Sequence, residues 1–132
     1  MQKNTILWAD DDADDLQMMR EILLKNNEDY KIVEVNNGKE ALNYLDRIEE
    51  QDYPSLIILD INMPILDGKE TLSILKTEKK YESIPVVVFT TSESQLDKMF
   101  CKKFGTEMIT KPPNFNCLET AVMKLLGFCK QA

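Results

Sequence analysis

Leu56-Ile57-Ile58-Leu59-Asp60 is a run of four apolar residues that ends on a carboxylate, and the turn formers Asn62, Pro64 and Gly68 follow it. A short, wholly apolar run indicates a strand buried on both faces, as in a parallel sheet. Asp60 then lies where a rigid strand meets a loop. A carboxylate in that position is open to solvent and can act as a nucleophile or as a metal ligand.

Other apolar runs in the chain also end on polar residues. Residues 6–9 lead into Asp10 and Asp11, residues 86–89 lead into Thr90, and a short run at residues 108–110 leads into Lys111. Ligands of parallel sheets bind at the carboxyl ends of the strands, so we expect these side chains to form one site with Asp60.

Strand-like and helix-like segments alternate along the chain without a linker, repeat or low-complexity tract. This alternation is typical of an α/β fold in which helices connect parallel strands. With right-handed connections it predicts a doubly wound, five-stranded parallel sheet of flavodoxin-like order 2-1-3-4-5, with helices on both faces. We expect residues 1–132 to form a single domain without an output domain.

Three acidic residues follow the pair Asp10 and Asp11. The apolar spacing predicts a helix from about Ala13 to Asn26, so Asp12, Asp14 and Asp15 fall at its N-terminal end. Carboxylates are favourable there because they cap free N–H groups and complement the helix dipole. We therefore interpret these three residues as helix-terminal charges and leave them out of the site.

Two later helices carry capping-box patterns. Ser92 is followed three residues later by Gln95, and Asn116 is followed three residues later by Glu119. In this motif the first side chain accepts a backbone N–H of the first turn. The pattern predicts that Ser92 and Asn116 begin the fourth and fifth helices.

The overall charge limits the partners of the chain. The net charge is -7 at pH 7 and the sequence pI is about 4.6, whereas nucleic-acid binding needs a basic face. No apolar stretch approaches a membrane span, and the N-terminus lacks a signal-peptide pattern. We expect a cytoplasmic protein that binds neither nucleic acid nor membrane.

The chain contains no histidine. This excludes Ser-His-Asp and Cys-His catalysis and histidine-ligated metal sites. If the chain takes a phosphoryl group from a phosphohistidine, that histidine must therefore belong to a partner protein. The three cysteines are odd in number and show no CxxC spacing, so they indicate neither a disulfide framework nor a zinc site.

Carboxylates from Asp10, Asp11 and Asp60 would repel one another in one pocket. A hard cation resolves this conflict, and Mg²⁺ prefers a few carboxylate or carbonyl oxygens together with water. The cation, the Lys111 ammonium and the Thr90 hydroxyl would stabilise the charge of a phosphoryl group during transfer. Asp60 is then the expected attacking carboxylate, which would form an aspartyl phosphate.

The chain resembles the receiver domain of response regulators, from bacterial two-component signalling, over essentially its whole length. The resemblance rests on residues 6–12, 59–68, 88–92 and 109–112, in this order and spacing. It implies that Asp60 is the phosphoacceptor and that Thr90 and Lys111 bind the phosphoryl oxygens. It also implies a signalling protein that catalyses only its own phosphorylation and dephosphorylation.

The resemblance further implies the metal ligands and the partners. Asp11 and Asp60 would bind Mg²⁺ directly together with the backbone carbonyl of Asn62, and Asp10 would bind mostly through water. The phosphoryl donor would be a histidine kinase or a histidine phosphotransfer protein. Movement of Thr90 would switch the face made by the fourth helix, fifth strand and fifth helix, which would bind a downstream protein or a second copy of the chain.

Met108 departs from the family pattern. Family members usually carry an aromatic residue three positions before the lysine, and Met108 stands there instead. Methionine is flexible and its rotamers specify a state less sharply, so Thr90 and Met108 form an unusual candidate switch pair. The family also suggests a cis Lys111–Pro112 bond, which proline permits.

Two other classes of function stay open. One is a constitutive interaction module with a vestigial site. The intact set of site residues argues against this alternative, whereas the departure at Met108 favours it. The other is a magnesium-dependent phosphatase, which is disfavoured because Asp60-Ile61-Asn62 lacks the second acid of such enzymes and no cap segment encloses a substrate. An FMN-binding flavodoxin is set aside, because no phosphate-binding loop rich in Gly, Ser and Thr follows the first strand.

Overall fold

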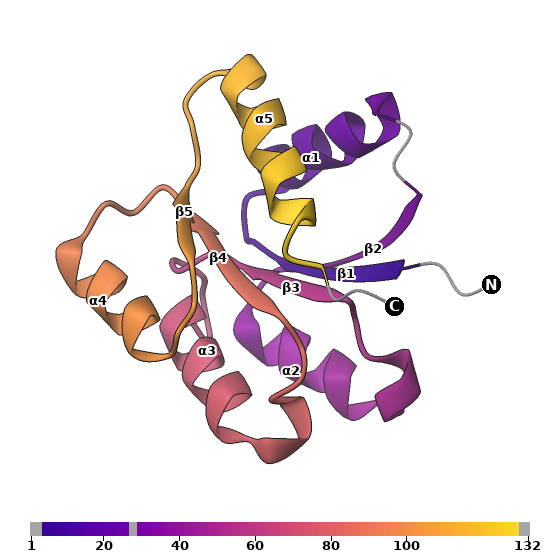
Figure 1. The fold of residues 1–132 in the computed structure, drawn as a ribbon, viewed down its shortest axis with the longest axis vertical. Coiled ribbons are helices and arrows are strands. Elements are labelled where there is room, and N and C mark those ends of the chain that lie inside the picture. Colours follow the sequence, from indigo (N-terminus) through magenta and orange to yellow (C-terminus); the bar gives the residue numbers. More distant parts are fainter. Residues whose placement is uncertain (1–3, 27–28, 130–132) are drawn as a thin grey trace.

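The computed structural model describes residues 4–26 and 29–129. Strands and helices alternate along this part of the chain, as Figure 1 shows. The strands are β1 (Asn4–Ala9), β2 (Tyr30–Val35), β3 (Leu56–Leu59), β4 (Val86–Thr90) and β5 (Met108–Thr110). The helices are α1 (Ala13–Lys25), α2 (Gly38–Asp46), α3 (Gly68–Thr77), α4 (Gln95–Lys103) and α5 (Phe115–Leu126), and short 3-10 turns lie at Glu50–Asp52 and Lys79–Tyr81.

The strands form one five-stranded sheet in the order β2-β1-β3-β4-β5, and every neighbouring pair is parallel. The predicted fold class and strand order are confirmed. The chain passes from β1 outward to β2 and then returns to β3 on the other side of β1. The strand order therefore reverses between β1 and β3, which is where doubly wound sheets bind their ligands.

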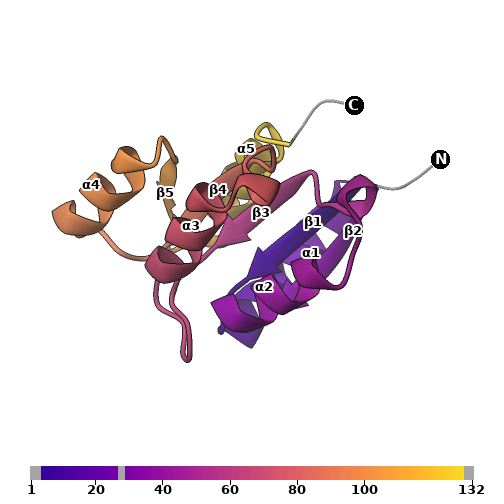
Figure 2. The same cartoon turned by 90° about the horizontal axis from the view of Figure 1, so that it is seen from below.

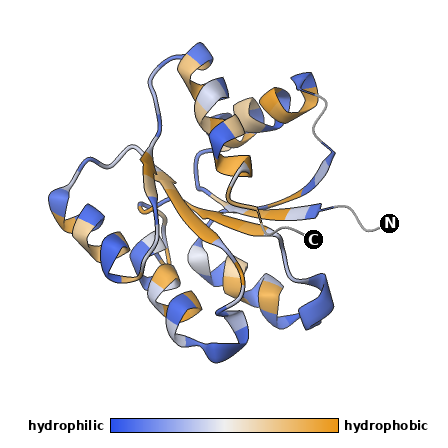
Figure 3. Cartoon of the chain, in the orientation of Figure 1, coloured by the Kyte–Doolittle hydropathy of each residue, from blue (hydrophilic) through white to orange (hydrophobic). Residues whose placement is uncertain are grey.

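Helices cover both faces of the sheet, because successive strand residues point to opposite sides. One core contains Leu7, Ala9, Ile57 and Leu59 together with apolar residues of α2, α3 and α4. The other contains Ile6, Trp8, Ile58 and Phe89 together with residues of α1 and α5. Figure 3 shows the apolar strands and inward helix faces, and Figure 2 shows α4 beyond β5 at the outer edge of the sheet.

The start of α1 confirms the capping interpretation of Asp12. Its carboxylate accepts the N–H groups of Asp14 at 3.0 Å and of Asp15 at 3.1 Å, which satisfies donors that the first turn leaves free. The helix runs from Ala13 to Lys25. The predicted bounds are therefore correct to within one residue.

The capping residues predicted for α4 and α5 were wrong. Ser94 caps α4 by accepting the N–H of Asp97 at 3.3 Å, and Asn114 caps α5 by accepting the N–H of Cys117 at 2.9 Å. Each loop offers more than one polar side chain that can cap a helix, so the sequence pattern leaves the choice open. Ser92 is instead part of the loop between β4 and α4.

No helix within residues 4–26 and 29–129 combines the length and the apolar character that crossing a bilayer would require.

Candidate functional site

The predicted site residues come together because they lie at, or directly after, the carboxyl ends of neighbouring strands. The N–H of Asp60 donates to the carbonyl of Ala9 at 2.9 Å, which sets Asp60 beside the end of β1. The N–H of Lys111 donates to the carbonyl of Thr90 at 2.7 Å, which sets β5 beside the end of β4. Parallel pairing thus carries residues that are far apart in sequence to one edge of the sheet.

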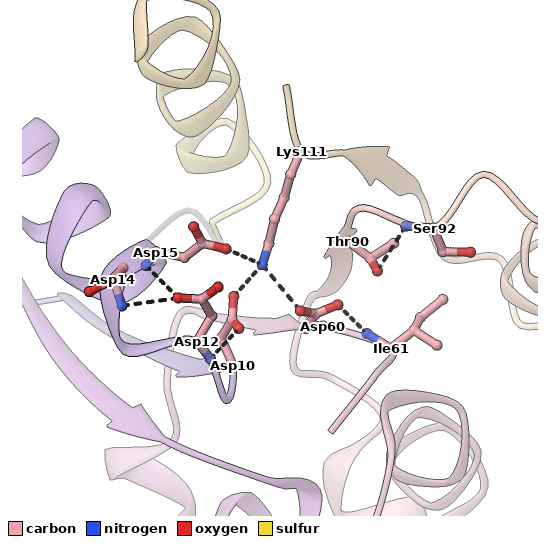
Figure 4. A network of polar contacts seen from close by, with 9 residues as sticks. All are labelled: Asp10, Asp12, Asp14, Asp15, Asp60, Ile61, Thr90, Ser92 and Lys111. Carbon is pink, nitrogen blue, oxygen red and sulfur yellow. Dashed lines mark hydrogen bonds and ion pairs between the residues drawn. The ribbon is translucent and has the colours of Figure 1, made fainter. Parts of the chain in front are cut away.

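The Lys111 side chain lies at the centre of the acidic residues. Its ammonium Nζ donates to Asp10 Oδ2 at 2.5 Å, to Asp15 Oδ2 at 2.9 Å and to Asp60 Oδ2 at 3.1 Å. Figure 4 shows Lys111 reaching between these three carboxylates. An ammonium has three N–H donors, and these three contacts match that number.

The protonation of the pair Lys111 and Asp10 reflects both burial and charge. Burial alone would lower the pKa of Lys111, but the hydrogen bond and charge of Asp10, the charge of Asp60 and the hydrogen bond of Asp15 raise it above its ordinary value. Burial raises the pKa of Asp10 to about 6, although Lys111 opposes this change. Asp10 is only 1% exposed, so its charged form depends on the Lys111 ammonium beside it.

Asp10, Asp11 and Asp60 also form a set of potential metal ligands. One carboxylate oxygen of each lies within 4.8 Å of those of the other two. Asp10 and Asp60 are buried whereas Asp11 is exposed, so the set opens to solvent on one side. An all-oxygen set with access for water suits a hard divalent cation.

Asp60 uses its two oxygens differently. Oδ1 accepts the N–H of Ile61 at 2.7 Å, and Oδ2 accepts the ammonium of Lys111. These bonds hold the carboxylate at the end of β3. Asn62 follows in the loop and is exposed, and its carbonyl stays a predicted metal ligand.

The Thr90 hydroxyl is fully buried at the end of β4 and accepts the N–H of Ser92 at 3.3 Å. In Figure 4, Thr90 and Ser92 lie on the side of Asp60 opposite Asp10 and Asp15. Met108 is half-buried in β5 and lines a groove with Lys98 and Lys102 of α4. The two candidate switch residues therefore lie on the part of the sheet that faces α4.

The predicted cis Lys111–Pro112 bond is wrong, since this peptide bond is trans. Proline reduces the preference for the trans form to about 0.5–1 kcal/mol but does not reverse it. The isomer thus depends on the surrounding structure.

Two contacts near the site were not predicted from the sequence. The first is the ion pair between Asp15 and Lys111, although the position of Asp15 in the first turn of α1, next to the loop that carries Asp10, pointed to it. The second is Asp97, which accepts the Ser92 hydroxyl at 2.6 Å and pairs with Lys69 of α3 at 2.7 Å. No local pattern in the sequence indicates that second network.

The family model of the response regulator receiver domain matches residues 6–123. The chain belongs to this family. The receiver is similar to Histidine kinase P4 of Formosa agariphila, with 36% identity over 126 residues, 95% of this chain and 9% of that protein. It is also similar to Response regulator Rcp1 of Synechocystis, with 34% identity over 95 residues, 70% of this chain and 65% of that protein. The receiver thus spans less than two thirds of either relative.

Solved structures of receivers share the fold closely. The phosphorylated cyanobacterial phytochrome response regulator RcpA matches with a TM-score of 0.87 and 30% identity, over 97% of this chain and 94% of that chain. The Mn²⁺-bound form of Rcp1 matches with a TM-score of 0.84 and 29% identity, over 95% and 93% of the two chains. Receivers are signalling domains that bind a divalent metal in an acidic pocket and interact with histidine kinases or phosphotransfer proteins.

Proposed function

We propose that this receiver accepts a phosphoryl group on Asp60 from a phosphohistidine of a partner kinase or phosphotransfer protein. The observation that carries the proposal is the position of the Lys111 ammonium, 3.1 Å from Asp60 Oδ2 and within a set of carboxylates at the strand ends. The chain has no histidine of its own, so the donor histidine belongs to the partner.

The transfer is a displacement at phosphorus. An oxygen of Asp60 forms the new P–O bond while the P–N bond to the donor imidazole breaks, and the imidazole leaves with the electron pair of that bond and takes up a proton. Lys111 offers a positive charge to the phosphoryl oxygens, and Thr90 offers a hydroxyl donor. Water later hydrolyses the mixed anhydride, which returns the Asp60 carboxylate and releases phosphate.

Mg²⁺ is the cation that we propose for the acidic pocket. Asp10, Asp11 and Asp60 supply three carboxylates within 4.8 Å of one another, and the backbone carbonyl of Asn62 completes the proposed ligands. When bound, Mg²⁺ would supply positive charge for the transferred phosphoryl group. The open side at Asp11 leaves room for the waters that Mg²⁺ retains.

The proposed output is a change on the face made by α4, β5 and α5. Charge added at Asp60 draws the Thr90 hydroxyl and Lys111 toward it and shifts an equilibrium between two states of that face. Lys98, Lys102 and Lys103 are exposed on α4, where they suit a partner with acidic groups. A downstream protein or a second copy of the chain would bind there, and the net charge of -7 disfavours nucleic acid.

A cytoplasmic location belongs to the same proposal. A donor kinase uses ATP, so the receiver must share the compartment of its kinase domain. The receiver then acts by docking rather than by turnover of a free substrate.

The test is the intact mass of the protein after incubation with acetyl phosphate, with and without Mg²⁺. We expect one added phosphoryl group in the presence of Mg²⁺ and none for Asp60→Asn. Asp52→Asn is the matched control, because it removes one acidic charge in an exposed turn away from the site. An unmodified wild-type protein, beside a positive-control receiver that is modified, would favour a constitutive interaction module. Continuous release of phosphate from free phosphomonoesters would favour a phosphatase.

A further inference from the structure

We propose that Asp15 is a positioning residue, which holds the Lys111 ammonium on the α1 side of the pocket and competes with the phosphoryl group for it. The inference rests on the proposed function, because it concerns how readily Lys111 reaches a phosphoryl group on Asp60. It assigns a part in phosphorylation to a residue outside the set Asp10, Asp11 and Asp60.

The ammonium of Lys111 has no spare donor. Its three contacts go to Asp10 Oδ2, Asp15 Oδ2 and Asp60 Oδ2, at 2.5, 2.9 and 3.1 Å, and an ammonium has three N–H groups. To donate to a phosphoryl oxygen, Lys111 must give up one of these carboxylates or share a hydrogen between two acceptors. The strength of each contact therefore influences the phosphorylation rate.

Asp15 differs from the other two acceptors of Lys111. Asp10 and Asp60 belong to the set of potential metal ligands, whereas Asp15 does not. Neutralisation of that set by a cation weakens the hold of Asp10 and Asp60 on Lys111 but leaves the pair with Asp15 in place. Asp15 is then the carboxylate that still competes with a phosphoryl oxygen for the Lys111 ammonium.

The local structure of α1 fixes Asp15 in this position. The Asp12 carboxylate accepts the N–H groups of Asp14 and Asp15 and so begins the helix next to the loop that carries Asp10. The side chain of Asp15 points to Lys111, as Figure 4 shows. The side chain of Asp15 is 31% exposed and that of Lys111 is 6% exposed, so water can solvate Asp15 when Lys111 leaves. Asp15 therefore competes only moderately with a phosphoryl group for the Lys111 ammonium.

Asp14 provides a matched control. It lies in the same first turn of α1, carries the same charge and is exposed. Its side chain makes no hydrogen bond or ion pair with Lys111, whereas the side chain of Asp15 contacts Lys111 directly. Asp14→Asn and Asp15→Asn thus remove the same net charge and the same favourable interaction with the helix dipole, and only the second removes the ion pair.

The kinetic test compares the rate of Asp60 phosphorylation at subsaturating acetyl phosphate, with saturating Mg²⁺. We expect Asp15→Asn to react about two- to fivefold faster than wild type, the factor that a partly exposed ion pair supports. Asp14→Asn should stay close to wild type, and Asp15→Glu should restore the wild-type rate because it restores the carboxylate. Equal rates for the two Asn variants, or a slower Asp15→Asn, would overturn the inference.

The second readout needs neither metal nor phosphorylation. A lysine ammonium held by three acceptors exchanges its protons slowly, so Lys111 should give a resolved ammonium signal in ¹H–¹⁵N spectra of the metal-free protein. We expect this signal in wild type and Asp14→Asn and its loss in Asp15→Asn. An unchanged signal in Asp15→Asn would overturn the inference.

The two tests separate failure of the inference from failure of the proposed function. If the ammonium signal confirms the pair of Asp15 with Lys111 but the wild-type protein is not phosphorylated, the proposed function fails, and the proposed competition for Lys111 fails with it. If wild type phosphorylates and the Asp15→Asn rate is unchanged, only the inference fails.

Discussion

The backbone N–H of Lys111 donates a 2.7 Å hydrogen bond to the carbonyl oxygen of Thr90. This bond ties the end of β5 to β4, so the two predicted phosphoryl-binding side chains leave neighbouring strands at the same level. The Thr90 hydroxyl accepts the N–H of Ser92 at 3.3 Å. Movement of that hydroxyl toward Asp60 therefore breaks a bond to the loop that leads into α4.

Thr90→Val removes the hydroxyl and keeps the shape of the side chain. We expect Asp60 to remain reactive, while the population of the switched state of α4 falls about fivefold, since one hydrogen bond of about 1 kcal/mol is lost. The measurement is the change in the NMR chemical shifts of the α4 backbone amides when beryllofluoride, which mimics a phosphoryl group, is added with Mg²⁺. Thr90→Ser keeps the hydroxyl and is the control. A full α4 response in Thr90→Val would show that this hydroxyl does not transmit the signal.

Asp97 links the loop after β4 to α3. Its carboxylate pairs with Lys69 and accepts the Ser92 hydroxyl, and these two hydrogen bonds, with Lys69 the larger cause, lower the pKa of Asp97. A carboxylate with a lowered pKa in the folded state stabilises the protein above its unfolded-state pKa. That stabilisation is lost as the pH falls through the folded-state pKa.

Asp97→Asn should therefore lower the free energy of unfolding by about 1 kcal/mol at pH 7. The difference from wild type should shrink as the pH falls below the unfolded-state pKa of about 4, and it should disappear once the pH has passed the lower pKa of the folded state. Urea unfolding at a series of pH values measures both effects, with Asp52→Asn as the control for a lost surface charge. A difference that stays constant down to about pH 2 would contradict the stabilisation by the charged form.

Gly68 lies where α3 passes close to the strand that carries Asp60. A Cβ atom at Gly68 would lie 2.1 Å from the carbonyl oxygen of Asp60 and 2.7 Å from Cα of Ile61, so the backbone would have to move. Gly68→Ala should cost about 1–3 kcal/mol of stability and slow phosphorylation, because Asp60 moves with its backbone.

Gly127→Ala is the matched control for this effect. The nearest atom to a Cβ at Gly127 is the carbonyl oxygen of Lys124 at 3.2 Å, at the far end of α5. Thermal unfolding and the intact-mass assay should separate the two variants. Equal stability and equal phosphorylation of both would refute the close packing at Gly68.

The strand order and the positions of Asp10, Asp60 and Lys111 could be predicted from sequence because they depend on periodicity. Apolar runs identify buried strands. Because the strands are parallel, the residues that follow them all lie at the same edge of the sheet. The same logic placed Thr90 at the end of β4. These predictions required no knowledge of side-chain rotamers.

Other features depend on choices between alternatives of similar energy. Ser94 rather than Ser92 caps α4, and the Lys111–Pro112 bond is trans. Ile65 has a φ of 69° in a turn where the N–H of Leu66 donates to Pro64 at 2.7 Å, a conformation that a β-branched residue seldom adopts. Long-range contacts such as the one between Asp15 and Lys111 are likewise absent from a local sequence pattern.

The most direct test of the proposed function identifies the residue that carries the phosphoryl group. Borohydride reduces an aspartyl phosphate to homoserine, which peptide sequencing by mass spectrometry can locate. After treatment with acetyl phosphate and Mg²⁺, we expect homoserine at position 60 and at no other aspartate, and none when Mg²⁺ is left out. Homoserine at a different position, or none in a fully folded protein beside a labelled control receiver, would contradict Asp60 as the phosphoacceptor.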